Sequence, residues 1–285
     1  MLMEIWRGSW YNGGRDEKEY FFKISDEGVV FMRCKGDSVR ILYFNMRDLG
    51  SFPGLEDGEL HVWRFCLEDG RGFPKPEDYL SKDEMEQLER YKLESARECY
   101  RIGHTALRMI LAGYLCMPAD SLEFQVNPYG KLFLPEDYGI YFNISHAGEY
   151  VVLAFGRFSP IGIDIEEVYD LSAADVIIKR FFHPREAREY PAVSDSLRQD
   201  WFFKRWTVRE AYVKGLGTGL YTAPESFYVR EEADGSFSIE TSDENSCDPC
   251  TFKAAGRQTV SAWRIQPLLA PDGYFCSLAF LETPK

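Results

Sequence analysis

Strand-forming and helix-forming segments occur in the same order twice along this chain, once on each side of about residue 157. Each time, a strand is followed by helical segments and then by further strands. No short-period repeat is present in the sequence, which excludes a solenoid. The pattern therefore predicts an α+β protein built from two similar halves.

The N-terminal segment is rich in aromatic and β-branched residues separated by turn residues, which predicts a strand-rich extension over residues 1–58. We place the first half at 59–157 and the second half at 158–285. The extension could continue the sheet of the first half, form a separate module or mediate self-association. Strands are expected at 20–24, 29–34, 39–44, 60–67, 141–144, 151–155, 161–165, 260–265 and 274–281, with a hairpin at 123–126 and 131–134.

Helix signals lie between these strands. Ser81 and Glu84 have the spacing of a capping box, which predicts a helix running to about residue 91. Apolar residues from 96 onwards recur at helical spacing, and Pro118 lies beyond the end of that helix. In the second half, Ser172 is the expected cap of a helix through 182, and Pro184 suits the first turn of the next. A long helix is expected from 195 to 214, ended by Gly215.

Composition excludes several classes of function. The net charge is −13, from 46 acidic and 33 basic residues, which argues against general nucleic-acid binding. No apolar run is long enough to cross a bilayer, and the N-terminal residues do not resemble a signal peptide. The seven scattered cysteines are typical of free thiols in a reducing compartment. We expect a cytoplasmic monomer that binds neither membrane nor nucleic acid.

Two acidic residues stand in an apolar run, Ile161 to Glu166. Because side chains alternate along a strand, Asp164 and Glu166 project from the same face. Two like charges on one face are unfavourable unless a cation or hydrogen bonds compensate. The alternative, a strand end with two exposed acids, is weakened because the acids stand among Ile161, Ile163 and Ile165, whose alternate face is expected to be buried.

A second group of chemistry-bearing residues has helical spacing. Trp206, Glu210 and Lys214 are four apart and share one helix face, with Arg209 beside them. Lys214 offers a phosphate a point charge, and Arg209 offers a planar fork. Ordinary surface pairing of these cations with Glu210 is the alternative. Together with the strand acids, the group suits a hard divalent cation that holds a phosphorylated ligand.

Other motifs are weaker. Ser145 and His146 follow an apolar stretch and could donate to a phosphate, but no Gly-x-Ser-x-Gly elbow supports a serine hydrolase. Cys247 and Cys250 have metal-like spacing without a second pair, so a loop coincidence is favoured over zinc. Neither a phosphate-binding Gly-Lys loop nor a dinucleotide fingerprint is present. The densest basic segment, which is alternatively a solvated helix face, comprises Arg90, Lys92, Arg97, Arg101, His104 and Arg108.

Three motifs in order and at matching spacing resemble one family. They are Phe142-Asn143-Ile144-Ser145-His146, Gly162-Ile163-Asp164-Ile165-Glu166 and Trp206-x-x-Arg209-Glu210-Ala211-x-x-Lys214, with Tyr129-Gly130-Lys131, Arg180-Phe181-Phe182 and Gly273-Tyr274 in support. From Glu59 to Leu281, the chain resembles the 4′-phosphopantetheinyl transferases of the surfactin-synthetase-activating (Sfp-like) type. Residues 1–58 have no counterpart in the compact members of that family.

The resemblance implies two pseudo-symmetric α+β halves with the active site and coenzyme A between them. It also implies a reaction: the 4′-phosphopantetheine group of coenzyme A moves to a serine of an apo acyl or peptidyl carrier protein, and adenosine 3′,5′-bisphosphate leaves. Mg²⁺ suits this chemistry because it binds few protein carboxylates and keeps positions open for phosphate oxygens and water.

The resemblance also assigns roles to individual residues. Asp164, Glu166 and Glu210 would hold the metal, and Glu210 would also help to deprotonate the serine. Lys214 and Arg209 would stabilise charge on the pyrophosphate. The residues expected to contact coenzyme A are Ser145, His146 at the 3′-phosphate, Lys131 near the same cleft, and Lys92 and Arg97 as candidates.

The chain departs from the family at two positions. Arg209 stands where the family usually has lysine, and Cys99 aligns with an arginine early in the second helix. One alternative is a metal-dependent phosphodiesterase that uses the same three acids on another phosphate ester. A second is a homologue that binds coenzyme A or a carrier without transfer, of which Arg209 and Cys99 would be signs. The intact acids and Lys214 argue against the second of these. A basic docking patch for an acidic carrier is expected from Lys179, Arg180, Arg185, Arg188, Lys204 and Arg205.

Overall fold

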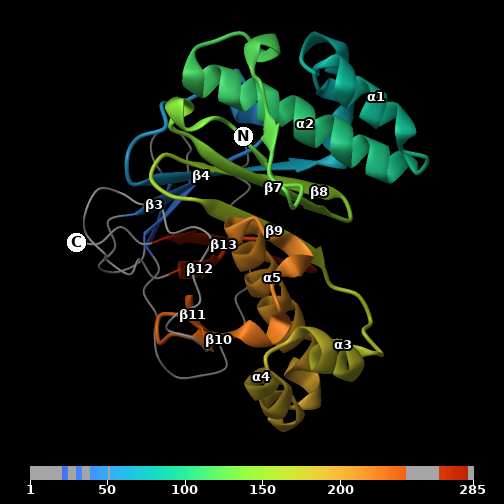
Figure 1. Cartoon of the computed structure of the whole chain (residues 1–285), viewed down its shortest axis with the longest axis vertical. Coiled ribbons are helices and arrows are strands. Elements are labelled where there is room, and N and C mark those ends of the chain that lie inside the picture. Colours follow the sequence, from blue (N-terminus) through green and yellow to red (C-terminus); the bar gives the residue numbers. More distant parts are fainter. Residues whose placement is uncertain (1–20, 25–29, 34–38, 51, 242–262, 282–285) are drawn as a thin grey trace, which may run out of the picture.

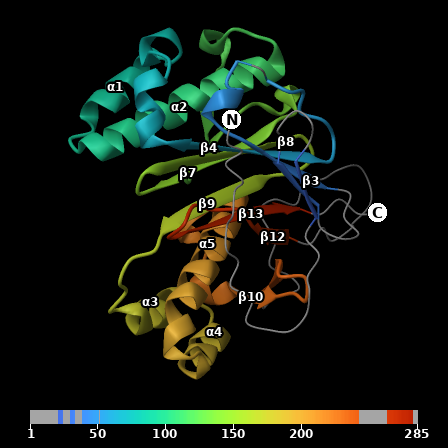
Figure 2. The same cartoon turned by 180° about the vertical axis from the view of Figure 1, so that it is seen from behind.

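The computed structural model describes residues 21–24, 30–33, 39–50, 52–241 and 263–281 of the chain. Within these residues, two large sheets lie between two groups of helices (Figures 1 and 2). The first sheet has the strand order β1 (Phe21–Ile24), β2 (Val30–Arg33), β3 (Arg40–Phe44), β4 (Glu59–Cys66), β8 (Tyr150–Gly156) and β7 (Tyr141–Ala147). The second has the order β10 (Phe227–Glu231), β11 (Phe237–Thr241), β12 (Trp263–Pro267), β13 (Tyr274–Leu281) and β9 (Ile161–Glu167).

The two halves share one topology. In the first half, β4 leads to α1 (Lys82–Arg90) and α2 (Glu94–Leu115), then to the hairpin β5 (Gln125–Val126) and β6 (Leu132–Phe133), then to β7 and β8. In the second half, β9 leads to α3 (Ala174–Phe181), α4 (Pro184–Glu189) and α5 (Arg198–Leu216), then to the hairpin β10–β11, then to β12 and β13. The first strand of each half is antiparallel to the last, and the last to the one before it. The predicted two-half α+β architecture is confirmed.

Most predicted elements are observed, with differences at their ends. The capping box at Ser81 and Glu84 begins α1 as predicted. Helix α3 begins one residue later than predicted, with Ala173 rather than Ser172 at its N-cap. Helix α5 begins at Arg198 rather than 195 and continues past Gly215 to Leu216, and Gly217, with a φ of +73°, forms the left-handed cap. Residues 260–262 of one predicted strand, and the Cys247–Cys250 pair, lie outside the described residues.

The strand-rich extension continues the sheet of the first half. Strand β3 pairs in parallel with β4, with Arg40 opposite Glu59. Its Ile41 and Phe44 side chains are buried, and the Phe44 ring stacks on Trp63 at 4.8 Å between ring centroids. Of the three roles left open for residues 1–58, sheet extension is the one observed in the described part of that segment.

Strand β9 has two different faces, as its alternating sequence predicts. Ile161, Ile163 and Ile165 are buried in a core between the two sheets, against side chains of β4 and β8. Asp164 and Glu166 alternate with them and therefore project to the other face, where α5 packs. Figure 1 shows α5 on that side of β9, and α1 with α2 on the far side of the first sheet. The acids thus lie between a strand and a helix of the second half.

The helix approaches β9 closely because both elements carry small residues at the contact. A Cβ at Gly162 would collide with the backbone oxygen of Ala211 and the backbone nitrogen of Gly215. Gly215 is itself covered by the Trp263 ring. This explains why Gly215 lies inside the helix rather than at its end. Within the described residues, no helix is both long and apolar enough to cross a membrane.

Candidate active site between the two halves

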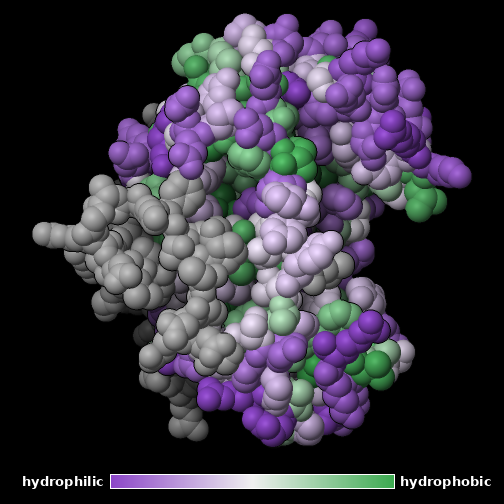
Figure 3. Space-filling view, viewed as in Figure 1, coloured by the Kyte–Doolittle hydropathy of each residue, from purple (hydrophilic) through white to green (hydrophobic). Residues whose placement is uncertain are grey.

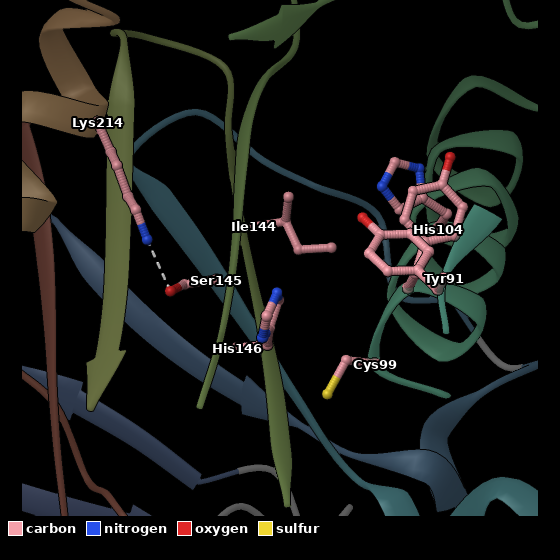
Figure 4. Close-up of a pocket in the computed structure, with 8 residues that line it drawn as sticks. Tyr91, Cys99, His104, Ile144, Ser145, His146 and Lys214 are labelled. Atoms are coloured by element: carbon pink, nitrogen blue, oxygen red, sulfur yellow. Dashed lines mark hydrogen bonds between the residues drawn. The ribbon is translucent and has the colours of Figure 1, made fainter. Parts of the chain in front are cut away.

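A pocket of about 290 Å³ lies between the halves. Its lining comes from α2 and the residues before it, from β7 and from α5: Tyr91, Cys99, Tyr100, His104, Ile144, Ser145, His146 and Lys214. Figure 4 shows Lys214 at one end of the pocket and Tyr91 and His104 at the other. The pocket therefore joins a cationic end to an aromatic end.

The cationic end is held together by contacts across the two halves. Strand β7 lies beside β9, and the Asn143 Oδ1 accepts a hydrogen bond of 2.8 Å from the backbone N–H of Ile163. Lys214 Nζ donates to Ser145 Oγ at 2.7 Å and to Asp164 Oδ1 at 2.6 Å. Ser145 Oγ in turn donates to Asp164 Oδ1 at 3.0 Å. Three predicted site residues thus form one hydrogen-bonded group (Figure 4 draws the Lys214–Ser145 bond).

The three predicted metal ligands share an electrostatic environment. Burial raises the pKa of Asp164, while Lys214 opposes the rise. Burial and the neighbouring Asp164 raise the pKa of Glu166 to about 7. Burial, and again Asp164, raise the pKa of Glu210. Burial thus disfavours the charged form of all three carboxylates, and the charge of Asp164 adds to this effect at Glu166 and Glu210. A nearby cation would favour the charged form of each.

The donor set fits a hard divalent cation. Asp164 is only 3% exposed, and its Oδ2 is a buried oxygen with no hydrogen-bond partner among the described residues. Asp164 Oδ1 is taken by Lys214, and Glu166 accepts a 3.0 Å bond from Trp206 Nε1. In the described part of the chain, no three His, Cys, Asp or Glu side chains lie close enough together to form a ready-made metal site. The unpaired carboxylate oxygen and the surplus negative charge are what Mg²⁺ would satisfy.

The structure does not bring Arg209 to this group, which corrects its expected place at the pyrophosphate. Arg209 is 4% exposed, and its guanidinium pairs with Glu186 Oε2 at 2.6 Å. It also donates to the backbone oxygen of Pro224 at 2.6 Å and lies over the Phe227 ring. Consecutive helical residues point about 100° apart, so Arg209 leaves the face that carries Glu210.

Lys131 is also placed differently from the expectation that it lines the cleft. Its Nζ donates to three backbone oxygens of the second half, those of Ile161, Lys214 and Gly215. It is not among the described residues that line the pocket. Lys92 and Arg97 are exposed and lie outside the lining, although Tyr91 and Cys99 beside them belong to it.

Five lining residues were not assigned to the site from sequence: Tyr91, Cys99, Tyr100, His104 and Ile144. Tyr91, Tyr100 and His104 form the aromatic end, and the rings of Tyr100 and His104 stack with centroids 3.9 Å apart. His104 Nδ1 lies 3.3 Å from Glu84 Oε1. Tyr100 and His104 are four apart and so share one helix face, the one local signal that links them. That this face lines the pocket depends on how α2 packs.

His146 completes the lining next to Ser145. Burial, followed by the charge of Lys214, lowers the pKa of His146. The imidazole is therefore neutral at pH 7 and offers a ligand one N–H donor and one acceptor. This leaves Lys214 as the one lysine or arginine among the described residues that line the pocket.

The comparisons with known proteins agree with this architecture. Residues 72–157 match the family model "4′-phosphopantetheinyl transferase, N-terminal", and residues 160–279 match the model "4′-phosphopantetheinyl transferase superfamily". The chain is similar to the 4′-phosphopantetheinyl transferase gsp of Aneurinibacillus migulanus, at 30% identity over 71% of this chain and 76% of that protein. It is also similar to Sfp of Bacillus subtilis, at 32% identity over 61% of this chain and 76% of that protein.

A third relative is HetI of Nostoc sp., at 33% identity over 58% of this chain and 72% of that protein. A solved holo-(acyl-carrier-protein) synthase from Bacillus anthracis, in complex with coenzyme A, overlaps 44% of this chain and 96% of its own, at 20% identity and a TM-score of 0.34. The protein belongs to the 4′-phosphopantetheinyl transferase superfamily, and its reaction class is 4′-phosphopantetheinyl transfer.

Proposed function

We propose that this enzyme moves the 4′-phosphopantetheine group of coenzyme A to a serine of an apo acyl or peptidyl carrier protein, with Mg²⁺ as its metal. The observation that carries the proposal is the meeting of Lys214, Asp164 and Ser145 at a pocket between the halves. In the reaction, the serine oxygen forms a bond to the β-phosphorus, and the bond from that phosphorus to the leaving phosphate oxygen breaks. Adenosine 3′,5′-bisphosphate is released.

Each residue of the group has a separate task in this proposal. Lys214 places a positive charge where the pyrophosphate gains negative charge. Ser145 and neutral His146 orient coenzyme A by hydrogen bonds. Glu210, whose pKa is raised by burial, accepts the proton of the attacking serine. Asp164, Glu166 and Glu210 hold Mg²⁺, which when bound supplies charge neutralisation for the phosphate oxygens.

For carrier docking we propose the outer surface of α3 and α4. Lys179, Arg180 and Arg188 are exposed there, beside the exposed Val176. Figure 3 shows hydrophobic and hydrophilic side chains next to one another in the region where Figure 1 places α3. A cationic surface with an apolar centre on a protein of net charge −13 suits an acidic partner.

Three of the six cations expected in this docking patch are otherwise engaged. Arg185 pairs with Glu240 at 3.2 Å, and Lys204 pairs with Glu231 at 2.9 Å. Arg205 is buried and donates to a backbone oxygen of β10. We therefore propose the smaller patch named above. We further propose that the enzyme acts as a monomer in the cytoplasm.

The decisive experiment is intact-mass analysis of a carrier. Incubation of the protein with Mg²⁺, coenzyme A and each of several apo carriers should add one phosphopantetheine group to at least one of them. Absence of the adduct on every carrier, with coenzyme A binding intact, would favour the non-transferring homologue. Hydrolysis of another phosphate ester without an adduct would favour the phosphodiesterase. Glu166→Ala should abolish Mg²⁺-dependent transfer while the far-ultraviolet circular dichroism stays unchanged.

A further inference from the structure

The β5–β6 hairpin of the first half reaches the C-terminal end of α5 in the second half. At its turn, Lys131 Nζ donates to the backbone oxygens of Lys214 at 2.6 Å, Ile161 at 2.9 Å and Gly215 at 3.1 Å. Ile161 is the first residue of β9, and the other two lie in the last turn of α5. One side chain therefore joins the helix and the strand between which the acids lie.

The chemistry of the ammonium group suits this position. The last carbonyls of a helix have no partners within the helix, and a cation is favoured at that negative end. An ammonium group carries three donors, which match the three backbone oxygens in number. Charge-assisted hydrogen bonds of this kind are stronger than neutral ones. The Lys131 ammonium is thus engaged with the backbone of the second half rather than with the pocket.

The hairpin turn is shaped to present this side chain. Asn127 Oδ1 accepts hydrogen bonds from the backbone N–H groups of Tyr129 at 2.9 Å and Lys131 at 2.8 Å. Gly130 has a φ of +93°, which favours glycine at this point of the turn. Asn127 Nδ2 donates to the backbone oxygen of Gly217 at 2.6 Å. The turn therefore contacts α5 at its last residues and again at its cap.

The turn of α5 held by Lys131 is the turn that carries Lys214. The Lys214 backbone oxygen accepts from Lys131, while its side chain reaches Asp164 and Ser145. A shift of this turn would move the one lysine or arginine among the described lining residues of the pocket. A misplacement of about 1 Å in such a group costs roughly 100-fold in rate.

We infer that Lys131 is a positioning residue, which holds the last turn of α5 against β9 and thereby keeps the Lys214 ammonium at Asp164 and Ser145. Its contribution to activity passes through Lys214 and not through contact with coenzyme A. This inference rests on the proposed function for its catalytic consequence, and on the three hydrogen bonds for its structural one.

A double-mutant cycle tests the route through Lys214. The variants are Lys131→Met, Lys214→Met and both together, compared by kcat/KM for coenzyme A and by the calorimetric Kd of coenzyme A. Lys131→Met should lower kcat/KM by about 10-fold to 100-fold alone, and by less than about twofold in the Lys214→Met background. Lys131→Arg should recover most of the loss. Additive effects, as expected from direct contact with coenzyme A, would overturn the inference.

Hydrogen exchange tests the tether without any use of activity. In Lys131→Met, peptides covering residues 210–217 should exchange faster than in the unmodified protein, while peptides of α2 should not change. Lys82→Met, at an exposed lysine of α1, is the matched control and should alter neither exchange nor activity. Unchanged exchange over 210–217 would refute the tether. Should Lys131→Met not fold, Lys131→Gln retains two N–H donors and replaces it.

The double-mutant cycle and the hydrogen-exchange experiment together distinguish a failure of this inference from a failure of the proposed function. If the unmodified protein binds coenzyme A but transfers nothing, the proposed function fails and the cycle is read from the Kd values. If it binds no coenzyme A at all, both the transfer and the catalytic part of the inference fail. The exchange arm would then still decide whether Lys131 holds the end of α5.

Discussion

Asp164, in the second half, accepts a hydrogen bond from Ser145 in the first half. One of its oxygens accepts from Lys214 and Ser145, and the other is buried without a hydrogen-bond partner in the described residues. Its charge also acts on Glu166 and Glu210, raising the pKa of each. The protonation of this acid cluster and its affinity for a cation are therefore coupled.

The raised pKa of Glu166 predicts that Mg²⁺ binding depends on pH. Its folded value of about 7 lies above the ordinary 4.5, so a proton must leave for Mg²⁺ to bind below about pH 7. The groups that face it, Asp164, Glu210, Lys214 and Trp206, are part of the same site. Mg²⁺ affinity should rise by up to about tenfold per pH unit between pH 6 and 7, and level off near pH 8.

Calorimetry in two buffers of different ionisation enthalpy measures the protons released. Release should be observed at pH 6.5 and be smaller at pH 8.5, and Glu166→Gln should reduce it. The same shift destabilises the metal-free protein as pH rises from about 4.5 to 7, because the folded state binds the extra proton. Mg²⁺ affinity that is independent of pH over this range would contradict the prediction.

Arg209 was expected to act on the pyrophosphate, but its contacts in the structure indicate a role in stability. Its buried pair with Glu186 joins α5 to α4, and Glu186 is fully buried. Removing one partner of a buried pair leaves an uncompensated charge, whereas removing both does not.

Arg209→Met should therefore lower the free energy of unfolding by about 3–5 kcal/mol, measured by urea denaturation. Adding Glu186→Met should restore a large part of the loss. Arg230→Met, at an exposed ion pair of β10, is the control and should cost at most about 1 kcal/mol. If Arg209→Met changes Mg²⁺ affinity without changing stability, Arg209 belongs to the active site after all.

At the scale of elements, the contact between α5 and β9 sets the geometry of the site. Asp164 and Glu166 come from the strand, and Glu210 and Lys214 from the helix, so the distance between the two elements decides whether these groups meet. Gly162 and Gly215 allow the close approach because neither carries a Cβ. The third support is Lys131, which arrives from the other half.

Gly162→Ala should therefore force α5 away from β9. The added methyl group would meet backbone atoms of Ala211 and Gly215, which cannot rotate aside as a side chain would. We expect a loss of about 1–3 kcal/mol in the free energy of unfolding and a larger loss of transfer activity. Gly54→Ala, whose added methyl group would have no other atom within 4 Å, should change stability by less than about 0.5 kcal/mol. Equal effects at the two glycines would contradict this account.

At the scale of the whole molecule, the two halves share one core between their sheets, and the extension is part of the first half. Ile41 of β3 lies in the core between the sheets, and Phe44 lies in the core under α2. Arg40 pairs with the nearly buried Glu59 at 2.6 Å. The extension is therefore integral to the fold in the residues that the structure describes.

Phe44→Ala tests this integration. Loss of its stack on Trp63 and of its burial should cost about 3–5 kcal/mol in the free energy of unfolding. Leu93→Ala, at a side chain that is 71% exposed, should cost less than about 0.5 kcal/mol. A small effect of Phe44→Ala on denaturation would mean that the extension is a separable module.

The sequence by itself determined the features that depend on local periodicity. The order of strands and helices, the shared face of Asp164 and Glu166, and the helical spacing of Glu210 and Lys214 all follow from the repeat of side chains along a strand or helix. The C-terminal end of α5 was less well predicted, because packing of Gly215 against Trp263 outweighs the local preference of glycine to end a helix.

Only the tertiary structure decided where the long-range partners lie. Lys131 finds its acceptors 30, 83 and 84 residues away, and no local pattern encodes that separation. Arg209 faces Glu186 rather than the acids because of how α4 packs on α5. The aromatic end of the pocket likewise depends on the placement of α2 against β7. Local spacing thus indicated which charged residues share a face of a strand or helix. The packing of the two halves determined which of these residues meet.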